Sequence, residues 1–99
     1  MGLHLSRDNY RTYRAYRDLL DDKLTELALY AKELCPEAVV EVSATSYEDE
    51  DGHVDIFPPP SLPEEEERIE LAVAARAAEI FEETGLFILC AAFDPPDKP

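Results

Sequence analysis

The residues best suited to chemistry are one histidine and its acidic neighbours near the middle of the chain. His53 and Asp55 are alternate residues of a predicted strand, and the predicted hairpin places Asp49 opposite His53. A histidine that a carboxylate orients can transfer protons, and these side chain types also bind divalent cations. We therefore expect either a solvated acidic turn or, as the alternative, a metal-dependent module that uses the Asp49/His53/Asp55 face.

Neither cysteine fits a recognised reactive pattern. Cys35 and Cys90 lie in separate halves of the chain, without CxxC or Cys/His spacing, and neither His4 nor His53 is placed to act as a local base. Two small buried thiols are the expected outcome. We predict no catalytic residue, no metal-ligand set and no cofactor, so the chain is interpreted as a non-enzyme, although the alternative stays open.

One comparison supports that alternative. The expected order of helix, hairpin, helix and strand, with Val42-Ser43 on the first strand and His53-Val54-Asp55 on the second, resembles the minimal nucleotidyltransferases. That family has Gly-Ser after the first strand, Asp-x-Asp on the second and a third carboxylate on the last. The resemblance implies a two-metal site on triphosphate oxygens. This chain lacks the glycine, has His53 in place of one aspartate and has no carboxylate on the last strand, so the module would be degenerate.

Acidic side chains dominate the composition. The 99 residues carry 23 acidic and nine basic side chains, a formal charge of −14. Residues 1–35 contain six of each sign, so the whole excess lies in residues 36–99. Such a charge repels nucleic acid and anionic lipid, and we expect contact with neither. The predicted binding surface consists of Glu48, Asp49, Glu50, Asp51, Asp55, Glu64, Glu65, Glu66 and Glu67.

These observations favour a small non-catalytic interaction or regulatory domain of unknown process, which presents an acidic face to a basic protein partner. The carboxylates would speed the encounter by electrostatic steering. The longest apolar run, residues 86–93, has eight residues, too few to span a membrane. No signal-like segment is recognisable, so we expect a cytoplasmic protein.

The length predicts one domain over residues 1–99, with residues 1–5 and 94–99 flexible. Apolar residues at helical spacing predict a long first helix from Ser6 or Asp8 to Leu34, closed by Pro36. Its predicted buried stripe is Tyr10, Tyr13, Leu20, Leu24, Leu27, Ala31 and Leu34. A second helix is predicted to start at a capping box of Ser61 and Glu64 and to end at Gly85. Its predicted buried stripe is Ile69, Ala72, Val73, Ala77, Ile80 and Phe81.

Three strands are predicted, over residues 38–47, 53–57 and 86–93. A three-residue loop with left-handed Gly52 would pair Tyr47 with Asp55 and turn Val54 and Ile56 inward. The fold class is α+β: a two-layer αββαβ domain with both helices on one face of a three-stranded antiparallel sheet of order 2-1-3. The third strand is then an apolar edge. It predicts a homodimer through Phe87, Leu89 and Phe93, or through the open side of the sheet around Phe57.

Overall fold

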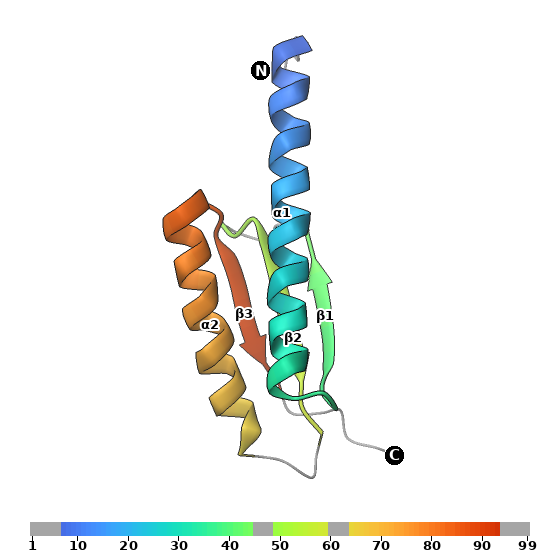
Figure 1. Ribbon diagram of the computed structural model, residues 1–99, viewed down its shortest axis with the longest axis vertical. Helices are drawn as coiled ribbons and strands as arrows, with labels where there is room; N and C mark the ends of the chain where they lie inside the picture. The colour runs from blue at the N-terminus through green and yellow to red at the C-terminus, as the bar shows by residue number, and fades with distance from the viewer. Residues whose placement is uncertain (1–6, 45–48, 60–63, 94–99) are drawn as a thin grey trace.

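The computed structural model describes residues 7–44, 49–59 and 64–93, with side chains from residue 13 onward. Its elements are α1 (Arg7–Leu34), β1 (Val39–Ser43), β2 (Gly52–Phe57), α2 (Glu65–Thr84) and β3 (Ile88–Ala92). The predicted αββαβ order and α+β class are confirmed. Both helices cover the same face of the sheet, and the first turns of α1 extend beyond it (Figure 1). The terminal segments predicted to be flexible lie outside the described residues.

The strands are arranged in the order β1-β2-β3. β2 is antiparallel to β1 and parallel to β3, so the predicted order 2-1-3 and the fully antiparallel sheet are wrong. Because α2 carries the chain back along the sheet, β3 runs in the direction of β2 and pairs directly with it. β2 takes the centre since its Val54 and Ile56 are fully buried, whereas Val42 on β1 is about half exposed. The third strand is an edge, as predicted.

The register of β1 against β2 differs from the prediction by six residues. Ser43 faces His53 and Glu41 faces Asp55, so the predicted pair of Tyr47 with Asp55 is wrong and the connection is longer than three residues. Gly52 is the first residue of β2 and is not left-handed. A Cβ at this position would lie 2.8 Å from the carbonyl oxygen of Ser43. Glycine is therefore needed here for the close approach of two strands.

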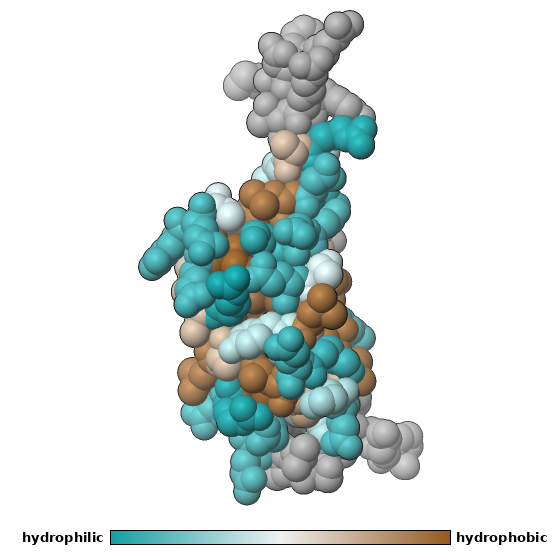
Figure 2. All heavy atoms as spheres, viewed as in Figure 1, coloured by the Kyte–Doolittle hydropathy of each residue, from teal (hydrophilic) through white to brown (hydrophobic). Residues whose placement is uncertain are grey.

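The core lies between the helices and the sheet. The predicted inward residues of β2 and most of both helix stripes are buried: Leu20, Leu24, Leu27, Ala31, Val54, Ile56, Ile69, Val73, Ala77 and Ile80. Two predicted core residues are exposed, Tyr13 by 54% and Phe81 by 52%. Leu34 and Ala72 are half-buried, and the side chain of Tyr10 lies outside the described part of the chain. Tyr13 lies where α1 leaves the sheet, and Phe81 faces Phe87 at a ring-centroid distance of 6.4 Å. On the helix side, hydrophilic side chains cover much of both helices, with apolar patches between them (Figure 2).

The N-terminal end of α2 differs from the prediction, whereas its C-terminal end agrees with it. The helix begins at Glu65 with Glu64 at the N-cap and no side-chain cap, so the capping box, which needs Glu64 inside the first turn, is not formed. Ser61 itself lies outside the described residues. Gly85 ends the helix at φ 82° and its N–H donates to the carbonyl of Phe81, as predicted. Among the described residues, no helix is long and apolar enough to cross a membrane.

Candidate functional site

The predicted acidic residues do not form one face. Asp49, Glu50 and Asp51 precede β2, whereas residues 64–67 follow its opposite end, beyond Phe57 (Figure 1). A six-residue strand extends about 20 Å, which exceeds the Debye length of about 8 Å in physiological salt. Each group therefore acts separately on a partner. Glu48 lies outside the described residues.

Two residues of the first acidic group hold the fold together. Glu50 is only 6% exposed, and its Oε2 lies 3.9 Å from Nδ1 of His53. The Asp51 carboxylate accepts hydrogen bonds from the hydroxyl of Tyr16 and from the N–H of Phe87, each at 2.7 Å. Asp49 is the exposed member of the group. The turn before β2 therefore presents fewer carboxylates to solvent than its sequence indicates.

The second acidic group opens α2. Glu65, Glu66 and Glu67 lie in its first turn, where the helix dipole stabilises negative charge. Glu65 accepts a hydrogen bond from Arg68 at 3.0 Å, and this bond lowers the pKa of Glu65 below its usual value. Glu64 and Glu67 are exposed. The group is thus a partly compensated acidic helix end.

A third acidic region lies on the side of the sheet that the helices leave uncovered, called here the open face. Because Val40, Val42, Val54 and Ile56 point to the helices, the residues between them point to the open face. The register places Glu41 directly opposite Asp55 there. Nε2 of His53 lies 3.8 Å from Oδ2 of Asp55. The open face thus brings His53 and Asp55 together, as predicted from their alternation.

Apolar side chains of β3 and its flanks border these carboxylates. A shallow hollow of about 200 Å³ is lined by Glu50, His53, Asp55, Leu89, Ala91 and Phe93. The ring of Phe93 stacks on Phe57 at a centroid distance of 5.6 Å. Leu89 and Phe93 are nearly half exposed. The open face therefore joins an acidic patch to an apolar one.

The arrangement differs from the metal-dependent alternative at two positions. Ser43, not Asp49, faces His53, and Asp55 lies beside Ala91 of β3, the strand on which the nucleotidyltransferase resemblance implies a carboxylate. Within residues 7–44, 49–59 and 64–93, no group of three histidine, cysteine or acidic side chains is arranged to hold a metal ion. Of the residues that the resemblance implies as ligands, Asp55 is the one present.

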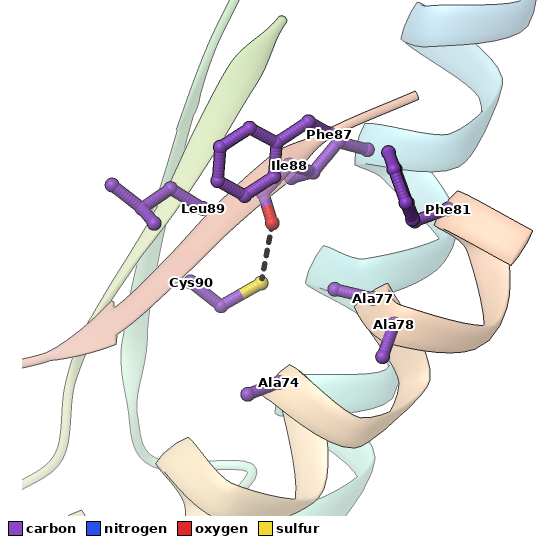
Figure 3. A pocket seen from close by; sticks show the side chains of 8 residues that line it. All are labelled: Ala74, Ala77, Ala78, Phe81, Phe87, Ile88, Leu89 and Cys90. Carbon is purple, nitrogen blue, oxygen red and sulfur yellow. Dashed lines mark hydrogen bonds between the residues drawn. The ribbon is translucent and has the colours of Figure 1, made fainter. Parts of the chain in front are cut away.

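A second surface, called here the α2–β3 groove, lies between α2 and the edge of β3 (Figure 3). It has a volume of about 410 Å³ and an almost wholly apolar lining: Ala74, Ala77, Ala78, Phe81, Phe87, Ile88, Leu89 and Cys90. Burial, followed by the charges of Asp55 and Glu70, raises the pKa of the Cys90 thiol to about 12. Cys90 is therefore an inert thiol in the groove.

Three functional candidates were missing from the sequence prediction. Glu41 was expected on the outer side of its strand, but the wrong register paired Tyr47 with Asp55 in its place. Ala74 and Ala78 lie one helical turn apart on α2 and continue to Phe81, so their spacing was a usable signal. Comparison of the chain with protein-family models, curated proteins and solved structures found no match.

Proposed function

We propose that this chain is a non-catalytic protein-interaction domain whose open face binds a basic segment of a partner protein. The observation that carries the proposal is the pair of Glu41 and Asp55, which face each other on neighbouring strands. Like charges in directly opposite positions destabilise a sheet. A lysine or arginine from a partner, placed between the two carboxylates, would remove this repulsion and gain charge-assisted hydrogen bonds.

The neighbouring apolar residues suit the same ligand. Lysine and arginine have long apolar stems that pack on hydrophobic surface while the charged group reaches a carboxylate. Leu89 and Phe93 offer such a surface beside Asp55, and the Phe93 ring can also attract the cation itself. The open face therefore fits a basic segment better than a free metal ion or a purely apolar peptide.

Among the described side chains, no lysine or arginine forms an ion pair with Glu41 or Asp55, and His53 is the basic residue beside Asp55. Within the described residues, each ion pair of a lysine or arginine joins residues of the helices, namely Lys23 with Glu26, Arg68 with Glu65, and Arg76 with Glu26 and Glu79. The acidic groups at the two ends of β2 add to the negative field around the open face. They raise the association rate of a basic partner, and salt should slow it.

A labelled peptide of alternating lysine and leucine tests the proposal by fluorescence anisotropy. The double variant Glu41→Gln/Asp55→Asn should bind it about tenfold or more weakly than the wild type. The matched control is Glu82→Gln/Glu83→Gln, which removes the same charge from exposed positions of α2 and should bind nearly as well as the wild type. Equal losses in the two variants would show a nonspecific charge effect and overturn the proposal.

The metal-dependent alternative has its own experiment. Thermal unfolding is followed with magnesium, manganese, calcium or zinc, for the wild type and for Asp55→Asn. Stabilisation by one ion that disappears in Asp55→Asn would favour the alternative over a peptide-binding role. An unchanged unfolding temperature with all four ions would leave the basic segment as the ligand to pursue.

A further inference from the structure

The apolar surface of α2 is wider than the core requires. At about 100° per residue, the apolar positions of α2 extend over roughly 200° of the helix circumference, about twice the stripe of an ordinary surface helix, and Glu70 and Glu67 also fall within this range. In order around the helix these positions are Ile69, Val73, Ala77, Phe81, Ala74, Ala78 and Leu71. The first half of this arc is buried in the core. Leu71 and Phe81 in the second half are more than half exposed, and Ala74 and Ala78 are also exposed. Of the second half, Ala74, Ala78 and Phe81 line the α2–β3 groove.

The backbone of β3 is open at the edge of the same groove. Phe93 donates its N–H to Ile56, and the Phe87 carbonyl accepts from Asp51, so the odd-numbered residues of this segment turn their backbone groups toward β2. Ile88, Cys90 and Ala92 must then turn theirs outward. The N–H of Ala92 donates to Oε2 of Glu70 at 3.0 Å, which agrees with this parity. The outward groups of Ile88 and Cys90 point to a side where the described chain has no further strand, and the carbonyl of Ile88 accepts a long, weak hydrogen bond from Sγ of Cys90 at 4.0 Å (Figure 3).

The pattern of these groups is self-complementary. If two copies of β3 pair antiparallel about a two-fold axis at Leu89, then Ile88 of each copy lies opposite Cys90 of the other. Each of these pairs exchanges both N–H to carbonyl hydrogen bonds, as opposite residues do in an antiparallel ladder. The bond between Ala92 and Glu70 stays intact. Such self-matching is what an isologous two-fold contact requires.

The exposed apolar area is of the size that a dimer needs. An aromatic side chain buries about 150–250 Å², so Phe81 and Phe87, each roughly half exposed, offer on the order of 200 Å². Leu71 and Leu89 bring this to about 400 Å² per copy. Two copies would bury about 800 Å² of these side chains, and the exposed Ala74 and Ala78 bring the total towards the lower bound of about 1,000 Å² for a specific interface. The hydrogen bonds along the two edges come in addition.

The lack of charge in the α2–β3 groove favours a second copy as the occupant. No charged residue lines the α2–β3 groove, so the net charge of −14 does not bring carboxylates into its centre, and a basic partner finds no counter-charge there. Residues 94–99, Asp-Pro-Pro-Asp-Lys-Pro, follow Phe93 at the end of β3 opposite to Phe87. They contain no large apolar side chain that would fill the groove.

We infer that two copies of this chain pair through β3 into one six-stranded sheet, with Leu89 opposite Leu89 and the exposed arcs of the two α2 helices in contact. The contact leaves out Glu41 and Asp55, the carboxylates that bind the basic segment in the proposed function, but it includes Leu89, which that function places beside the segment. The small side chains of Ala74 and Ala78 let the two helices approach closely. The two open faces become one continuous face across the dimer.

Sedimentation equilibrium of the full chain tests the pairing. The wild type should be a dimer, and Phe81→Glu should weaken dimerisation about tenfold or more because it places a charge in the apolar contact. Leu29→Glu is the matched control. Leu29, like Phe81, is a large apolar residue that is more than half exposed, but it lies on α1 outside the groove. Circular dichroism confirms that both variants are folded. A monomeric wild type, or a dimer that Phe81→Glu leaves unchanged, would overturn the inference.

Disulfide trapping tests the register. Opposite residues of a non-hydrogen-bonded antiparallel pair have Cα atoms about 4.5 Å apart, within the range of a disulfide. In a Cys90→Ala background, Leu89→Cys should therefore form a covalent dimer on mild oxidation, whereas Val39→Cys on β1 should not. A dimer without this cross-link would refute the two-fold at Leu89. Because Phe81→Glu retains Glu41 and Asp55, its peptide binding shows separately whether the proposed function holds.

Discussion

The hydroxyl of Tyr16 on α1 donates a 2.7 Å hydrogen bond to Oδ1 of Asp51, 35 residues further along the chain. Oδ2 of the same carboxylate accepts from the N–H of Phe87, and the N–H of Asp51 donates to the Phe87 carbonyl. One residue of the connection before β2 thus joins the first helix to the entry of β3. The entry to the α2–β3 groove is positioned by these contacts.

Replacing Asp51 should destabilise the fold. Asp51→Ala removes two hydrogen bonds to a carboxylate and should lower the free energy of unfolding by about 2 kcal/mol. Asp49→Ala, at an exposed neighbouring carboxylate, should change it by less than about 0.5 kcal/mol. Urea denaturation of both variants measures the difference. Equal effects would mean that Asp51 has no special structural role.

Tyr16 should make the protein sensitive to alkaline pH. The hydrogen bond to Asp51, burial and the charge of Asp51 raise the pKa of Tyr16 above its usual value of 10.0. The neutral phenol is therefore favoured in the folded state, and its contribution is complete below pH 10 and is lost as the pH rises through the folded pKa. Tyr16→Phe should show a smaller loss of stability above pH 10, measured by urea denaturation at several pH values.

The link between the helices should respond to acid. Burial disfavours the charge on Glu26, but hydrogen bonds from Arg76 and Lys23 outweigh it and lower the pKa of Glu26 below 4.5. Its stabilising contribution is therefore present above pH 4.5 and is lost as the pH falls through the folded pKa. Arg76→Met should flatten the acid side of the stability profile. Arg68→Met is the control, because Arg68 bonds Glu65 and not Glu26. Its stability should still fall with decreasing pH as Glu26 becomes protonated.

Cys90 should react slowly with alkylating reagents. With a pKa of about 12, its thiolate fraction near neutral pH is roughly a thousandfold below that of an ordinary cysteine. Iodoacetamide labelling followed by mass spectrometry should leave Cys90 largely unmodified in the native protein and label it on unfolding in urea. An engineered Val39→Cys on exposed β1 provides the reactive reference. Rapid native labelling of Cys90 would contradict the burial of this thiol.

The two described glycines at helix and strand ends should respond to alanine for different reasons. Gly52→Ala places a Cβ 2.8 Å from a backbone carbonyl, and this overpacking should cost about 1–3 kcal/mol. Gly85→Ala meets no atom within 4 Å, but Gly85 has a φ of 82°, so only the left-handed backbone strain of about 1–2 kcal/mol applies. Thermal unfolding of each variant gives the comparison. A larger loss of stability for Gly85→Ala than for Gly52→Ala would mean that backbone strain at Gly85 outweighs the close contact at Gly52.

The helices were predictable because their signals are local. The spacing of Leu20, Leu24 and Leu27 and the glycine at position 85 determine where the chain is helical and where it stops, without reference to distant residues. Spacing alone does not distinguish burial in the core from exposure on a second apolar surface. Tyr13 and Phe81 belong to apolar stripes by spacing, yet both are exposed, since α1 extends past the sheet and the arc of α2 continues beyond it.

The sheet was predicted less well because its geometry depends on contacts between distant residues. Asp51-Gly52 has the composition of a tight turn. In the structure, however, Gly52 makes room for the carbonyl of Ser43, and Asp51 accepts hydrogen bonds from Tyr16 and Phe87. Neither demand is visible in the local sequence. The register error that followed hid the opposition of Glu41 and Asp55, although the alternation that turns His53 and Asp55 outward together was readable.

The hydrogen bond from Ala92 to Glu70 has a consequence for aggregation. An exposed apolar edge strand is a template on which further chains can add without limit, as in amyloid. The Glu70 carboxylate occupies one of the outward donors and adds a negative charge at the end of that template. In the pairing that we infer, a single partner strand would fill the short remaining length of β3, and this edge would then be closed to further strands.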